Sequence, residues 1–203
     1  MKVLYVTDRS AVGDARIERV LQALRGTPGL FVQVREKIGS DRALLATARS
    51  ARAALGPSVP LFVNRRLDAA LAAGADGVHL PADGLPLKRV RSASPRGFRV
   101  GLSTHSPLQA AQAIEEGADL VVLGPVFDTP SKASFGPPLG AQALAGLPER
   151  ASHGADVFAI GGIDESRLEE LAPFADRISG IAAIRLIQEA DDPRAVVERI
   201  VAA

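Results

Sequence analysis

A glutamine and two cations alternate with valines at the end of the second short apolar run of this chain. Gln33, Arg35 and Lys37 share one face of a pattern with a period of two residues. Val32 and Val34 occupy the other face, which must pack against helices. An amide and two cations that point away from this packing face are suited to binding an anion such as phosphate. In the alternative interpretation, Arg35 pairs with a nearby carboxylate at a solvated strand end.

One histidine stands where general acid–base chemistry could take place. His105 lies among hydroxyl residues in the segment 103–106 and precedes a helix that is predicted to begin at Pro107. Imidazole titrates near neutrality and suits proton transfer, whereas a hydrogen-bonded structural role is the alternative. His79 alternates with apolar residues inside a predicted strand, which indicates packing or support of other site residues. His153 is expected at the surface.

Two further segments have features that suit phosphate binding. Gly161 and Gly162 follow the seventh apolar run, and their backbone N–H groups could approach phosphate oxygens closely. Arg185 follows the eighth run and could add its charge to the same site. The connection over residues 124–140 is long, and it could close over an anionic ligand. The other candidate ligand-binding residues are Asn64, Ser103, Thr129, Ser131, Lys132, Ala183 and Ile184.

Short apolar runs, each followed by an amphipathic stretch of helical period, must position these residues. The runs span residues 3–6, 30–34, 61–63, 77–80, 98–101, 120–123, 157–160 and 179–184. The helical stretches span residues 14–24, 41–55, 66–73, 85–94, 107–116, 141–147, 165–174 and 193–201. Strict alternation of strands and helices implies parallel strands with right-handed crossovers.

Eight such units favour a closed (βα)8 barrel, the TIM-barrel architecture of the α/β class, over an open doubly wound sheet. No G-x-G-x-x-G turn follows the first run, so dinucleotide binding is not indicated. We find no linker or low-complexity tract and expect a single domain over residues 1–203. In such a barrel the chemistry lies at the carboxyl ends of the strands, and the candidate residues fall there.

The composition excludes several classes of function. Hydrophobic residues make up 47% of the 203, and a net charge of +1 provides no broad field for nucleic acid or an anionic membrane. The lack of cysteine excludes disulfides, Cys-ligated zinc, iron–sulfur clusters and thiol catalysis. No apolar run is long enough for a signal peptide or a membrane span. We therefore expect a cytoplasmic protein without nucleic-acid or membrane partners.

Six segments, taken in order, resemble the thiamine-phosphate synthase and thiazole tautomerase family. They are LYVTD at 4–8, QVREK at 33–37, GVHL at 77–80, STHS at 103–106, GPVFDTPSK at 124–132 and AIGGI at 159–163. Together they span nearly the whole chain. The resemblance implies the same barrel that counting predicts. It also implies a small phosphorylated thiazole as partner and leaves a homodimer open.

Two positions depart from the synthase branch of this family. Synthases join a pyrimidine pyrophosphate to a thiazole phosphate and need magnesium, and the resemblance implies carboxylates for it after the third and fourth strands. These positions hold Arg65 and Gly84 in this chain. A cation repels the metal that a carboxylate would bind, and Asp83, one residue out of register, could replace only one of the two losses. No metal site is therefore expected.

These departures favour the tautomerase branch, an isomerase that moves one proton to aromatise a thiazole carboxylate phosphate without a metal. By the resemblance, His105 is then the catalytic acid–base group and Glu36 its partner base or orienting group, and no cofactor is expected. The loop over 124–132, by contrast, resembles the synthase. One alternative is therefore a thiamine-phosphate synthase, a transferase that would require magnesium at a rearranged site. A further alternative is a non-catalytic binder of a phosphate metabolite.

Overall fold

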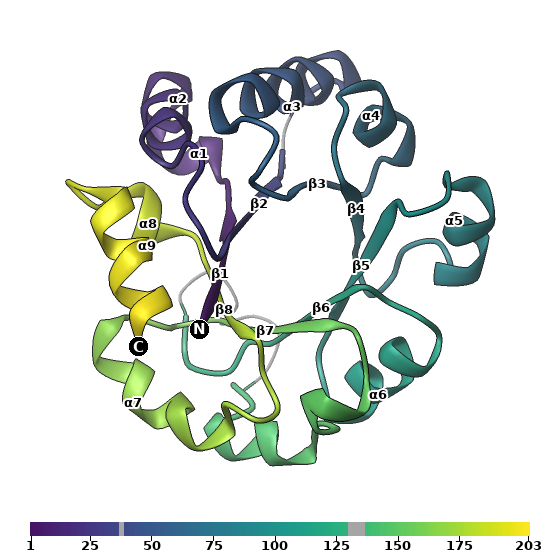
Figure 1. Cartoon of the computed structure of the whole chain (residues 1–203), viewed down its shortest axis with the longest axis vertical. Helices are drawn as coiled ribbons and strands as arrows, with labels where there is room; N and C mark the ends of the chain where they lie inside the picture. Colours follow the sequence, from purple (N-terminus) through teal and green to yellow (C-terminus); the bar gives the residue numbers. More distant parts are fainter. Residues whose placement is uncertain (37–38, 130–136) are drawn as a thin grey trace.

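Eight parallel strands close into a barrel in the computed structural model, which describes residues 1–36, 39–129 and 137–203. Consecutive strands are neighbours, and β1 pairs with β8 to complete the ring (Figure 1). The expected (βα)8 barrel is confirmed. The strands are β1 (Lys2–Val6), β2 (Leu30–Val34), β3 (Leu61–Asn64), β4 (Gly77–Leu80), β5 (Arg99–Thr104), β6 (Leu120–Leu123), β7 (Asp156–Ile160) and β8 (Gly180–Ala183).

Helices surround the ring of strands on the outside (Figure 1). The α-helices are α1 (Arg9–Val12), α2 (Asp14–Ala23), α3 (Asp41–Leu55), α4 (Leu67–Ala72), α5 (Leu87–Ala93), α6 (Pro107–Glu115), α7 (Leu168–Leu171), α8 (Arg185–Gln188) and α9 (Pro193–Ala202). Short 3-10 helices are η2 (Ala141–Gly146), η3 (Arg150–Ser152), η4 (Glu165–Arg167) and η5 (Ala172–Phe174). Within the described residues, no helix is long and apolar enough to span a bilayer.

The two-residue period of the strands divides the core into two layers. Val32 and Val34 of β2 belong to the larger apolar cluster, which the strands form with the surrounding helices. Phe31 belongs to a second cluster inside the barrel, where its ring centroid lies 5.5 Å from that of Phe158. Gln33 alternates with the valines and therefore faces the interior, as predicted.

Several helix boundaries differ from the expectations of the sequence. Residues 141–146 form the 3-10 helix η2 instead of an α-helix; the segment follows Gly140 and ends on Gly146, a residue that favours helix ends. The stretch over 165–174 divides into η4, α7 and η5, with Pro173 in the last of these. The predicted caps Ser106 and Asp192 are confirmed, because each accepts a backbone hydrogen bond ahead of a first-turn proline.

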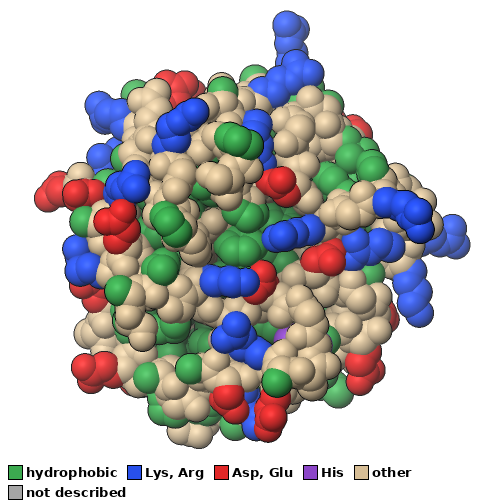
Figure 2. All heavy atoms as spheres, in the orientation of Figure 1, with side chains coloured by type: hydrophobic (Ala, Val, Ile, Leu, Met, Phe, Trp, Pro, Cys, Tyr) green, Lys and Arg blue, Asp and Glu red, His purple; other side chains and the backbone are tan. Residues whose placement is uncertain are grey.

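Acidic and basic side chains are interspersed over the face of the molecule that Figure 2 shows, and no region of one sign dominates it. This distribution agrees with the net charge of +1. A surface of this kind provides no extended field for a polyanion.

Candidate active site

Two hydrogen-bonded pairs of polar side chains line the barrel interior near the carboxyl ends of four adjacent strands. Gln33 on β2 is buried, and its Nε2 donates to Asn64 Oδ1 on β3 at 3.2 Å. On β4 and β5, His79 Nε2 lies 2.8 Å from Ser103 Oγ. The structure thus brings together three of the predicted site residues. Their amide and hydroxyl groups are suited to hydrogen bonding with a polar heterocycle.

His79 supports Ser103 from inside the barrel. The histidine is 2% exposed, and burial, with a smaller effect of the Arg35 charge, lowers the pKa of its imidazole to about 4. The ring is therefore neutral at pH 7. This position agrees with the expected role of His79 in packing and support.

Arg35 is held against the end of β1 by an ion pair. Its Nη2 lies 3.1 Å from Asp8 Oδ2, and its backbone N–H donates to Thr7 Oγ1 at 3.0 Å. Burial lowers the pKa of Arg35, and the neighbouring Asp8 carboxylate opposes that shift. Arg35 is therefore paired with a carboxylate, and its role in binding an anion stays a prediction. Its side chain retains 24% exposure and still borders the mouth.

Asp8 was not among the predicted site residues, although it is the first acidic residue after the first apolar run. Buried Gln188 of α8 fixes the backbone of Asp8, since Gln188 Oε1 accepts from Asp8 N at 3.2 Å. Tyr5 Oη donates to the same oxygen at 3.4 Å. A contact across 180 residues leaves no local signal in the sequence.

Glu36 lies on the helix side of β2 and faces α1. Its Oε1 is 3.3 Å from Arg9 Nη2, and its side chain is 9% exposed. Burial raises the pKa of Glu36, whereas the Arg9 charge lowers it. Glu36 and His105, both in the described part of the chain, make no hydrogen bond with each other. Lys37, the third member of the predicted anion-binding face, lies outside the described residues.

His105 joins the end of β5 to the end of β6. Its Nδ1 donates to the carbonyl oxygen of Gly124 at 2.8 Å, and its backbone N–H donates to Gln109 Oε1 at the same distance. The side chain is exposed at the mouth. The imidazole therefore positions the start of the loop after β6.

Gly161 and Gly162 form a turn against the segment that follows β6. Their φ angles are +106° and +63°, which favour glycine. A Cβ on Gly162 would lie 2.3 Å from the carbonyl oxygen of Asp128. Phe127 N donates to Gly161 O at 2.9 Å and ties the two segments together. In the described structure, the N–H groups of both glycines donate no backbone hydrogen bond, so they are free for an anion.

The end of β8 lies beside this glycine turn, because β7 and β8 are paired. Ala183, Ile184 and Arg185 follow one another there, and Arg185 is exposed. The predicted phosphate-binding residues therefore share one side of the mouth. Thr129 is described and has interaction partners. Ser131 and Lys132 lie outside the described residues.

The donor set at the mouth does not fit a magnesium ion. Asp8 pairs with Arg35, Glu36 pairs with Arg9, and Asp83 pairs with Arg65 at 3.7 Å. Among the described residues, no three His, Cys, Asp or Glu side chains form a group that could hold a metal. Magnesium requires several hard oxygen ligands, and here arginines compete for these carboxylates.

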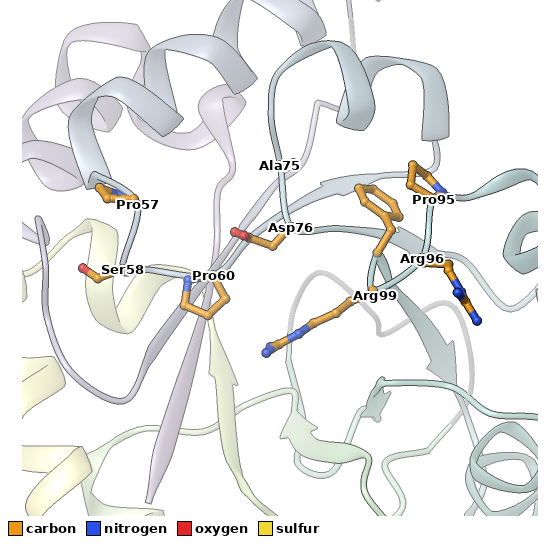
Figure 3. A pocket seen from close by; sticks show the side chains of 10 residues that line it. Pro57, Ser58, Pro60, Ala75, Asp76, Pro95, Arg96 and Arg99 are labelled. Atoms are coloured by element: carbon orange, nitrogen blue, oxygen red, sulfur yellow. The ribbon is translucent and has the colours of Figure 1, made fainter.

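A cavity of about 510 Å³ lies at the opposite end of the barrel. Its lining includes Pro60, Asp76 and Arg99, which stand at the starts of β3, β4 and β5. In Figure 3, the Asp76 and Arg99 side chains extend toward Pro60, while Arg96 points away. Asp76 accepts hydrogen bonds from Arg52 and from Leu61 N, which closes the β3–β4 connection. Groups at this end of such barrels serve stability, so we place the candidate active site at the mouth.

The closed barrel, with polar groups gathered at the carboxyl ends of its strands, defines an enzyme-type (βα)8 barrel. The family model described as thiamine monophosphate synthase matches residues 3–187, and the chain belongs to this family.

Relatives and one solved structure are similar to this protein over most of its length. A thiamine-phosphate synthase of Methanoculleus marisnigri is 40% identical over 184 residues, covering 89% of this chain and 86% of the relative. A thiamine-phosphate synthase of Gloeobacter violaceus is 43% identical over 87% of this chain, which spans 50% of that longer protein. The thiamine phosphate pyrophosphorylase of Pyrococcus furiosus superimposes with a TM-score of 0.82 at 27% identity, covering 99% of this chain and 94% of that one.

These comparisons overturn the expectation of a thiazole tautomerase. The relatives at about 40% identity carry the name thiamine-phosphate synthase, which was the alternative function. The isomerase interpretation, with His105 and Glu36 as the proton-transfer pair, was therefore wrong. It gave most weight to the lost carboxylates at Arg65 and Gly84.

Proposed function

We propose that this protein is a thiamine-phosphate synthase that joins hydroxymethylpyrimidine pyrophosphate to a thiazole phosphate. In this transfer, the bond between the pyrimidine methylene carbon and a pyrophosphate oxygen breaks, and the electron pair leaves with pyrophosphate. The methylene carbon then bonds to the thiazole nitrogen. The proposal is supported by two separate sets of polar atoms around one mouth: the glycine turn after β7, and the Gln33–Asn64 and His79–Ser103 pairs on β2 to β5. Two phosphorylated substrates need both sets.

The first set is proposed to bind the thiazole phosphate. It consists of the glycine turn after β7 and the end of β8, where backbone N–H groups and one cation are available. Its residues are Gly161, Gly162, Ala183, Ile184 and Arg185.

The second set is proposed to bind the pyrimidine pyrophosphate. Gln33, Asn64 and Ser103 offer amide and hydroxyl groups to the ring. Arg35 and Lys37 are proposed to offer charge to the pyrophosphate, and the candidate residues Thr129, Ser131 and Lys132 of the loop after β6 are proposed to bind the same group. His105 would hold that loop through Gly124. We propose that the reaction takes place in the cytoplasm of the cell.

The test is an assay of the purified protein with both substrates, with thiamine phosphate measured as the product. Omission of either substrate should abolish product formation. Ser103→Ala should raise the KM for the pyrimidine substrate about ten-fold, because one hydrogen bond to the ring is lost. Binding of a thiazole phosphate to a folded protein that makes no product would contradict the proposal and favour the non-catalytic binder.

A further inference from the structure

Arg65 occupies a strained backbone position at the rim of the barrel mouth. Its φ is +67°, and it is the non-glycine residue with positive φ in the described structure. Arg66 N donates to Asn64 O at 2.8 Å, so Arg65 is the central residue of a γ-turn. Arg65 N donates to His79 O at 2.8 Å, which fixes this turn to the end of β4. A glycine would adopt this conformation without strain.

The two adjacent arginines of this turn have different surroundings. Arg66 forms ion pairs with Asp68 and Asp41, and hydrogen bonds with these carboxylates raise the pKa of its guanidinium. Arg65 contacts Asp83 at 3.7 Å, and both side chains are open to solvent, with exposures of 58% and 84%. Such an exposed, long ion pair contributes little to stability. The Arg65 charge is therefore available to a ligand at the mouth.

A strained conformation that holds an available cation at the candidate site suggests a function, because strain of this kind persists where it positions a group. The ends of β2 and β3 are neighbours, so Arg65 stands beside the strand end that carries Arg35. The carboxylates here are paired with arginines and do not form a metal site among the described residues.

We propose that Arg65, with Arg35, binds the pyrophosphate group at the mouth in place of a metal ion. This inference rests on the proposed function. Guanidinium groups form paired hydrogen bonds with phosphate oxygens and stay charged. They would neutralise the charge that the leaving pyrophosphate gains. In this arrangement Asp83 competes with the ligand for Arg65.

The test is calorimetric titration of the whole protein with inorganic pyrophosphate, first in EDTA and then with millimolar magnesium. Binding should be saturable in EDTA and should not require magnesium. Arg65→Gly should weaken binding about ten- to a hundred-fold, because a charge-assisted contact is lost. The same variant should unfold at a higher temperature, since glycine relieves the positive-φ strain.

Matched variants separate the effect of the Arg65 charge from other effects of the substitution. Arg65→Lys should retain part of the affinity, and Asp83→Asn should bind pyrophosphate a few-fold more tightly. Arg89→Ala, which removes an exposed arginine from α5, should bind as the unmodified protein does.

Three results would overturn the inference: binding that appears only with magnesium, unchanged affinity in Arg65→Gly, or a lower unfolding temperature together with lost affinity. The last result would assign Arg65 a structural role. If binding follows Arg65 but no thiamine phosphate is made from the two substrates, the proposed synthase function fails and the pyrophosphate site stands. If synthesis proceeds only with magnesium, the synthase function stands and this inference fails.

Discussion

His79 is a buried residue that sets the hydrogen bonding of Ser103 at the mouth. Its Nε2 is bonded to Ser103 Oγ, while its Nδ1 has no hydrogen-bond partner in the described structure. A Cβ on Gly101 would lie 2.9 Å from Nδ1, so glycine at that position makes room for the ring. Buried N–H groups without a partner are rarer in folded proteins than buried acceptors without one. We infer that Nε2 carries the proton and donates to Ser103, which leaves the serine hydroxyl free to donate to a ligand.

The lowered pKa of His79 predicts a loss of stability in acid. The folded-state pKa of about 4 lies below the unfolded value of 6.5, so the unfolded chain takes up the proton first as the pH falls. Stability from this group is full above pH 6.5 and is lost between pH 6.5 and pH 4, by about 3 kcal/mol. The measurement is the free energy of unfolding in urea at pH 7 and pH 4.5. His79→Gln should reduce the difference between the two values, whereas His153→Gln, outside the barrel interior, should not.

At the scale of elements, the turn after β7 depends on its close approach to the segment after β6. Val126 N donates to Ile160 O at 2.8 Å, and Gly162 leaves no space for a side chain beside Asp128. The glycine pair therefore serves two purposes. It lets two loops pack together, and it leaves backbone N–H groups without a backbone acceptor among the described residues.

Gly162→Ala is expected to damage the proposed phosphate site. Its Cβ would meet the Asp128 carbonyl oxygen at 2.3 Å, so the turn must move and the N–H groups lose their alignment. Calorimetry should show at least about a ten-fold loss of affinity for a thiazole phosphate. Gly74→Ala is the control, because its φ of +65° nearly matches the +63° of Gly162 and no atom lies within 4 Å of the new Cβ. It should cost about 1 kcal/mol of stability and leave phosphate affinity intact. Equal affinities in the two variants would contradict this role of the turn.

At the scale of the whole molecule, the barrel is closed by the contact of its first and last strands. Lys2 pairs with Gly180 and Leu4 with Ala182. A Cβ on Gly180 would lie 1.8 Å from the carbonyl oxygen of Lys2. Only glycine allows the two backbones to approach this closely, so Gly180 is required for β1 and β8 to pair and close the barrel.

Gly180→Ala should therefore lower the free energy of unfolding by about 4 kcal/mol or more, because neither backbone can shift without opening the β1–β8 ladder. Gly154→Ala is the matched control, since it has no positive φ and no atom within 4 Å of the added Cβ. Urea unfolding followed by circular dichroism measures both. If the Gly180 variant is as stable as the Gly154 variant, the β1–β8 pairing can adjust to the added Cβ and the prediction is wrong.

Much of the fold could be predicted because its signals are local. The two-residue alternation around Gln33 and the caps at Ser106 and Asp192 depend on residues a few positions apart, and each prediction was confirmed. The prediction of a tautomerase instead of a synthase was wrong. Arg65 indicates that a carboxylate is lost, but its residue type does not show what replaces the function of that carboxylate.

The sequence by itself determined eight strand–helix units, the barrel that they close and the strand ends that carry chemistry, because side-chain periodicity and turn residues act over short distances. Only the tertiary structure decided which partner each polar group takes. Arg35 bonds to Asp8 across 27 residues, and His79 bonds to Ser103 across 24. These contacts depend on the register and closure of the barrel, which bring strand ends together at the mouth. The spacing of residues along the chain does not encode them.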